Sequence, residues 1–277
     1  MTTMLSVPAL ASTGWGDAFA NEVAKGLRDL RNGWRAVLAE MITFPVFYLL
    51  IVMFMGRGRL LDDLLVPVMI GLVGLAFIHE QVNRVFWGYL GDLQSGVLEQ
   101  TYLTPLPSAA IVLGRQVAAV LGALPVVGAI LATGCIAVAV TGGTVPFAWS
   151  VLVPAAAIAI GTCGLALVLC GLTLVYKRIE SITQASVALY AIAGGTLVPL
   201  SELPAWAAAA SRALIPVAPG IEAAQAILLD GATLTDLGTG WGLGWILLQP
   251  LLLGALGVLV FHRLERTAKA RGTLGRY

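Results

Sequence analysis

The sequence predicts an all-α integral membrane protein with six transmembrane helices. Of its 277 residues, 58% are hydrophobic and only 11% are charged, whereas soluble domains carry about 25% charged residues. Several uncharged stretches reach about 20 residues, the length that crosses a hydrocarbon core of about 30 Å. Lysine and arginine are distributed unevenly between the connecting segments, and this bias sets an orientation. A soluble globular protein is therefore excluded.

The N-terminal residues 1–36 are expected to be cytoplasmic and to include a helix that lies on the membrane over residues 15–35. Apolar residues recur there at helical spacing, and charged residues fill the opposite side. This pattern, with basic residues opposite Trp and Leu, is typical of an interfacial helix. An ordinary packed helix of a small cytosolic segment is the alternative. The apolar side consists of Trp15, Phe19, Val23, Leu27, Leu30 and Trp34.

Six apolar stretches are predicted to span the membrane within one domain, residues 37–264. With both ends inside, only Arg57, Arg59 and Arg212 of the basic residues lie outside. This asymmetry predicts a multi-pass protein of the cell (plasma) membrane with both termini cytoplasmic, including a basic tail at residues 265–277. The predicted spans cover residues 37–55, 64–85, 111–140, 149–175, 182–199 and 242–261.

The outer connection between the fifth and sixth spans, residues 200–236, is predicted to form two short helices. Pro204 opens the first, and Pro219 with Gly220 opens the second, because proline suits the first turn of a helix. Each piece has about a dozen residues, too few to span the bilayer. The prediction is therefore a re-entrant pair that dips into the outer leaflet, surrounded by protein or by a water-filled cavity.

The loop between the second and third spans, residues 88–108, is the most informative polar segment. Residues 95–107 read Ser-Gly-Val-Leu-Glu-Gln-Thr-Tyr-Leu-Thr-Pro-Leu-Pro. Gly91 and Gly96 are expected to bend the chain out of the second span, and residues 97–103 to form a short helix. Pro105 and Pro107 would end that helix. The segment is thus predicted to be a rigid knob, or else a solvated turn without a partner.

This loop resembles the one that joins the second and third spans in permeases of type 2 ABC exporters. A second segment, Pro-Leu-Ser-Glu-Leu-Pro-Ala-Trp at residues 199–206 followed by Pro216 and Pro219, is similar to the outer motif of the same family. The resemblance implies the six-span fold and a loop that docks onto a separate ATP-binding subunit. The coupling residues it implies are Gly96, Leu98, Glu99, Gln100, Thr104 and Pro105.

The resemblance also implies a second permease, either a copy or a paralogue, with the first and fifth spans at the seam. ATP and Mg would belong to the partner, since no Gly-Lys-Ser/Thr occurs in this chain and a P-loop requires it. No cofactor or nucleic-acid partner is expected. An amphiphilic or hydrophobic substrate is expected, with a drug or antibiotic favoured over a lipid or a lipid-linked glycan. A secondary transporter and a membrane enzyme are the rival classes.

A polar sequence at the end of the second span, His79-Glu80-Gln81-Val82-Asn83, supplies candidates for the translocation path. Ionisable groups at such depth usually face protein or water and mark a pathway; local pairing at the interface is the alternative. An intramembrane zinc site would require histidine where Asn83 stands. No metal site is therefore expected. Arg84 lies four residues after Glu80, so an ion pair along the helix is available.

Overall fold

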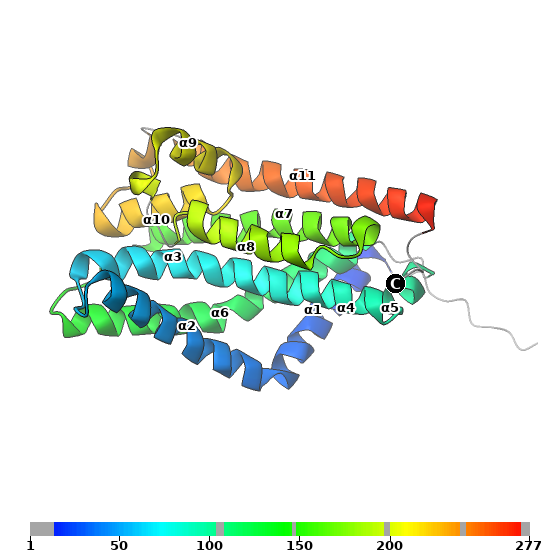
Figure 1. The fold of residues 1–277 in the computed structure, drawn as a ribbon, viewed down its shortest axis with the longest axis horizontal. Coiled ribbons are helices and arrows are strands. Elements are labelled where there is room, and N and C mark those ends of the chain that lie inside the picture. The colour runs from blue at the N-terminus through cyan, green and yellow to red at the C-terminus, as the bar shows by residue number, and fades with distance from the viewer. Residues whose placement is uncertain (1–13, 104–107, 146–147, 197–199, 239–241, 273–277) are drawn as a thin grey trace, which may run out of the picture.

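The computed structural model describes residues 14–103, 108–145, 148–196, 200–238 and 242–272, and these residues are helical without any β-strand (Figure 1). The helices are α1 (Trp15–Asn32), α2 (Trp34–Met55), α3 (Asp62–Glu80), the π-helix η1 (Gln81–Trp87), α4 (Gly88–Gln94), α5 (Val97–Tyr102), α6 (Ser108–Val140), η2 (Trp149–Val151), α7 (Leu152–Tyr176), α8 (Glu180–Ala193), η3 (Leu200–Glu202), α9 (Ala205–Leu214), α10 (Ala218–Leu229), η4 (Asp236–Gly238) and α11 (Gly242–Arg271).

Five of these helices are long and apolar enough to cross a membrane. They cover Trp34–Met55, Asp63–Gln94, Ser108–Val140, Trp149–Tyr176 and Gly242–Arg271, and the bent pair α9–α10 makes a sixth if it is counted as one broken span. The prediction of an all-α, multi-pass membrane protein is confirmed at this level.

The predicted fifth span differs from the helix that forms there. Residues 182–199 were expected to cross the bilayer, but α8 has 14 residues, about 21 Å at 1.5 Å per residue. That is shorter than a hydrocarbon core of about 30 Å. Gly194 and the positive φ of Gly195, 81°, interrupt the helix directly after Ala193. Residues 197–199 lie outside the part of the chain that the structure describes.

The elements predicted to be cytoplasmic gather at one end of the bundle. Figure 1 shows α4, α5 and the last turns of α11 at that end, with α9, α10 and the turn between α2 and α3 at the other. The axes of α9 and α10 differ by 105°, across a short break between them. Two short helices therefore stand where a re-entrant pair was predicted, whereas their depth in a membrane stays a prediction.

Close backbone contact joins α7 to α11. A Cβ atom added at Gly164 would lie 2.7 Å from the carbonyl oxygen of Leu253, and one added at Gly257 would lie 2.7 Å from the carbonyl oxygen of Gly164. Small residues allow helix backbones to approach in this way inside a membrane. The two helices thus pack as a tight pair.

The second span is longer than hydropathy predicts. Its helix runs from α3 through η1 and α4 to Gln94, giving 32 residues from Asp63 instead of an end near residue 85. Gly91 was expected to bend the chain, but it lies inside α4. The helix continues because its polar segment is covered by α6 and α7, and the bend comes later, at Ser95 and Gly96.

Candidate coupling loop and polar cluster

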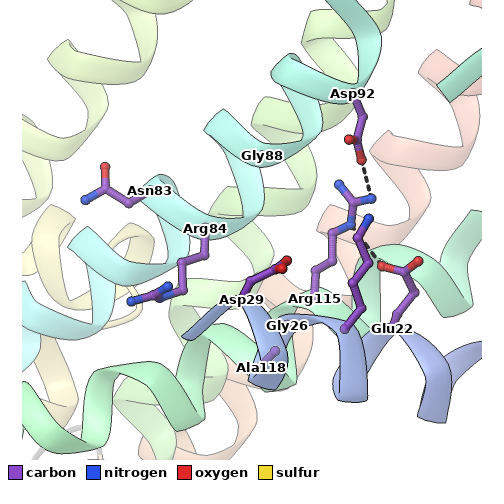
Figure 2. Close-up of a pocket in the computed structure, with 10 residues that line it drawn as sticks. Glu22, Gly26, Asp29, Asn83, Arg84, Gly88, Asp92, Arg115 and Ala118 are labelled. Carbon is purple, nitrogen blue, oxygen red and sulfur yellow. Dashed lines mark hydrogen bonds and ion pairs between the residues drawn. The ribbon is translucent and has the colours of Figure 1, made fainter. Parts of the chain in front are cut away.

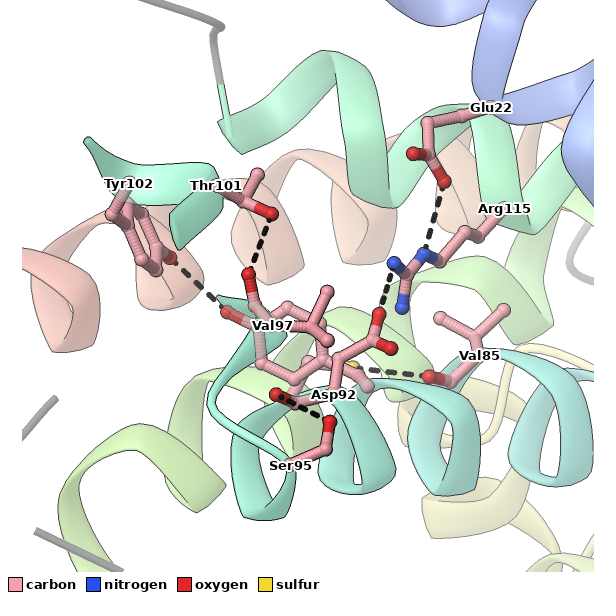
Figure 3. Close-up of polar contacts among 10 residues, drawn as sticks. Glu22, Val85, Asp92, Ser95, Val97, Thr101, Tyr102 and Arg115 are labelled. Atoms are coloured by element: carbon pink, nitrogen blue, oxygen red, sulfur yellow. Dashed lines mark hydrogen bonds and ion pairs between the residues drawn. The ribbon is translucent and has the colours of Figure 1, made fainter. Parts of the chain in front are cut away.

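The turn between α4 and α5 reverses the chain at Gly96. Its φ of 74° lies in the left-handed region, which glycine adopts without the steric cost that a Cβ atom brings. The Ser95 hydroxyl donates a hydrogen bond to the carbonyl oxygen of Asp92, 3.3 Å away (Figure 3). The local sequence therefore produces a sharp corner at the end of the long helix, as predicted for Gly96.

One side of α5 is fixed to the bundle. Leu98 is buried in a cluster that includes Leu93 of α4 and Phe261 of α11. The hydroxyl groups of Tyr102 and Tyr89 lie 3.1 Å apart (Figure 3). Burial raises the pKa of Tyr102 above its ordinary value. The short helix is thus held by contacts to α4 and α11 rather than by its own length.

The other side of α5 is exposed in the chain. Glu99 and Gln100 are exposed, and Leu103 just after the helix is 88% exposed. Desolvation lowers the pKa of Lys177, and the charge of Glu99 partly opposes this shift, so the turn after α7 lies near α5. Of the predicted coupling residues, Thr104 and Pro105 lie outside the described residues. The other four form one element with a buried anchor and an exposed acidic face.

An arginine on α6 connects this region to α1. The guanidinium of Arg115 pairs with Asp92 of α4, and its Nε donates to Oε2 of Glu22 on α1 over 3.2 Å (Figures 2 and 3). A Cβ atom added at Gly26 of α1 would lie 2.4 Å from Cβ of Ala118 on α6, so the two helices touch. We call Arg115, Glu22 and Asp92 the arginine clamp.

The arginine clamp borders a polar pocket of about 330 Å³ between α1, α6 and the second span (Figure 2). Sequence reasoning treated Arg115 only as a cytoplasmic charge and missed these contacts. The signal was present, because Arg115 is the only charged residue in the 33 residues of α6, and a charge in an apolar helix usually has a partner.

The predicted path residues His79, Glu80 and Asn83 do come together at the junction of α3 and η1. Asn83 Nδ2 and His79 Nε2 lie 2.6 Å apart, and Glu80 forms the ion pair with Arg84 that their spacing allows. Glu40 of α2 joins them, with Oε1 lying 3.9 Å from His79 Nε2. A π-helical turn, η1, starts directly after Glu80, and such turns occur frequently at functional sites.

This cluster brings together histidine, carboxyl and amide side chains. Among the described residues, no group of three or more His, Cys, Asp or Glu side chains is arranged to hold a metal ion. Nearby, Gln81 donates to the carbonyl oxygen of Gln116 over 3.3 Å, and Gln116 donates to the carbonyl oxygen of Cys163 over 2.6 Å. These buried bonds tie η1, α6 and α7 together.

The fold and these two sites define a class: a helical, multi-pass membrane protein with a short, partly exposed helix directly after its second span. A scan against models of known protein families found no match. A search of the curated proteins likewise found no relative.

Proposed function

We propose that this chain is the permease subunit of a type 2 ABC exporter, energised by a separate ATP-binding subunit. The observation that carries the proposal is α5, a short helix with Leu98 buried beneath it and Glu99 and Gln100 exposed on it. A partner can bind the exposed face of α5, and the buried Leu98 then passes the movement of α5 to the bundle. The resemblance of residues 95–107 to the coupling loop of that family supports the same assignment.

The contacts of α5 supply a route for a push from the partner. Tyr102 contacts Tyr89 of the second span, and the ammonium group of Lys269 on α11 lies 4.7 Å from the centroid of the Tyr102 ring. Lys269 is in turn 2.9 Å from Glu265. The arginine clamp continues this route to α1. Displacement of α5 would therefore move the second and sixth spans and the N-terminal helix together.

The exported molecule is proposed to be amphiphilic or hydrophobic, with a drug or antibiotic favoured. It would pass between this chain and a second permease. The exposed apolar residues of α2 would contact that second permease. Ile42 is 66% exposed and Phe54 is 88% exposed on that helix, and such a surface suits either lipid or a partner helix. His79 and Asn83, which are partly exposed, would line the cytoplasmic part of the path, with the buried Glu80 behind them.

A charge reversal at Glu99 tests the coupling role. Glu99→Arg is expected to leave the permease folded, because the side chain is exposed, but to weaken assembly with the ATP-binding subunit. Mismatched charges at a desolvated contact cost about 2–5 kcal/mol, so bound partner and efflux should fall at least tenfold. Glu202→Arg, the same exchange at the opposite end of the bundle, is the matched control. Unchanged assembly and efflux in Glu99→Arg would refute the coupling assignment.

A further inference from the structure

Two carboxyl groups from different helices meet inside the bundle. Glu80 at the end of α3 has a side chain that is 2% exposed, and Glu40 on α2 has one that is 25% exposed. Glu40 acts on Glu80 both through its charge and from within hydrogen-bonding reach, so the two carboxyl groups lie close together. Because each carboxylate oxygen only accepts hydrogen bonds when ionised, this contact needs a hydrogen that neither ionised group carries.

The remaining bonds leave one oxygen of each group without a donor. Arg84 donates a hydrogen bond to Oε2 of Glu80. Oε1 of Glu80 and Oε2 of Glu40 are both buried and receive no hydrogen bond from the described residues. An unpaired buried charge of this kind is strongly unfavourable. A single proton between the two groups would satisfy both oxygens.

The charge balance around the pair also favours one bound proton. Arg84, a permanent cation, pairs with Glu80. With the Asn83 amide nitrogen donating, Nε2 of His79 accepts, so the imidazole is neutral, and its nearest oxygen of Glu40 is 3.9 Å away. Two carboxyl groups and one arginine become neutral together when one proton is bound.

Among the described residues, no Lys or Arg of the neighbouring helices forms an ion pair with either carboxyl group. The only charged residue of α6, Arg115, is committed to Glu22 and Asp92, and the sequence of α7 contains no charged residue. On α8 the only charged residue is the acidic Glu180. From α1, Lys25 and Asp29 both border the pocket that Arg84 also lines, so their opposite charges offset each other there.

We propose that Glu40 and Glu80 form a proton-binding site that holds one proton between α2 and α3 at neutral pH. Two carboxylates in contact in a low-dielectric site do not both ionise, because the second charge is opposed by the first. Loss of the proton would leave two negative charges against Arg84 and would drive α2 away from α3. The site goes beyond the proposed export function and does not depend on it, although it includes Glu80, which lies behind the proposed path.

Infrared spectroscopy of the protein in lipid membranes tests the site, because the C=O stretch of a protonated carboxylic acid is distinct from the bands of ionised carboxylates. Ordinary carboxyl groups titrate near pH 4, so they are ionised at neutral pH. The wild-type protein is expected to retain a protonated-carboxyl band at neutral pH, which shifts in D2O and disappears at alkaline pH. Glu40→Gln and Glu80→Gln should each remove it, and Glu202→Gln, an exchange at an exposed glutamate, should not.

The outcomes separate a proton from other occupants. A wild-type spectrum without the band, or a band that persists in both variants, overturns the proposal. A band that is missing in sodium or potassium buffer but present when a large organic cation replaces them shows that a metal cation fills the gap, which also overturns it. The wild-type titration needs no variant, so a folding defect in Glu80→Gln leaves the test intact.

Discussion

Replacing Arg115 by glutamine tests whether the arginine clamp stabilises the bundle. The side chains of Arg115, Glu22 and Asp92 are 13%, 15% and 22% exposed. The change leaves two carboxylates of α1 and α4 without their cation. Breaking a fully buried pair costs about 3–5 kcal/mol, and an exposed pair contributes about 0.2–1 kcal/mol. This nearly buried site therefore predicts a loss of about 2–3 kcal/mol.

Thermal unfolding in detergent, followed by tryptophan fluorescence, measures the effect. A loss of this size corresponds to a decrease in Tm of about 3–5 °C for a chain of this length. Arg28→Gln is the matched control, because Arg28 is exposed on α1 and exposed substitutions usually change stability by less than about 0.5 kcal/mol.

A triple variant separates the unpaired charge from the loss of packing. Glu22→Gln and Asp92→Asn, added to Arg115→Gln, remove the two carboxylates that the single variant leaves unpaired. Replacing a whole buried ion network is often nearly neutral, so the triple variant should recover most of the lost Tm. A triple variant as unstable as Arg115→Gln, or a single variant that melts with the wild type, would refute the reasoning.

Two further predictions concern the helix pair α7–α11 and the orientation in the membrane. Gly164→Val should destabilise the protein by about 1–3 kcal/mol through overpacking, because its Cβ atom would lie 2.7 Å from a backbone oxygen of α11. Gly128→Val is the control, because a Cβ atom there meets nothing within 4 Å. Equal Tm values for the two variants would contradict the tight packing of α7 against α11. In a background without Cys135, Cys163 and Cys170, an impermeant maleimide applied to intact cells should label Ala232→Cys and not Ala270→Cys, and the reverse pattern would overturn the predicted orientation.

Local signals in the sequence predicted most of the helix boundaries. The amphipathic pattern placed a helix at residues 15–35, and α1 ends at Asn32, where Gly33 interrupts it. Proline and glycine placed the two short helices near α9 and α10. These features depend on neighbouring residues, so a single sequence contains enough information to find them.

Long-range contacts explain what the sequence did not predict. Hydropathy ended the second span near residue 85 because Asn83, Arg84 and Asp92 are polar. In the structure Asn83 and Arg84 contact side chains one turn earlier on the same helix, Asp92 pairs with Arg115 of α6, and the helix continues to Gln94. The arginine clamp joins residues that are 93 and 23 positions apart. No helical periodicity relates such positions. The meeting of Glu40 with Glu80 likewise depends on how α2 packs against α3.

Purification of the chain from its native host in mild detergent tests whether it works with an ATP-binding subunit. A P-loop ATP-binding protein is expected to copurify in stoichiometric amount. ATP hydrolysis by the complex should change with an exported substrate, because a substrate that binds the two conformations unequally shifts the cycle. The chain purified alone should hydrolyse no ATP. Hydrolysis by the chain alone, or the absence of an ATP-binding protein together with intact efflux, would contradict the proposed export function.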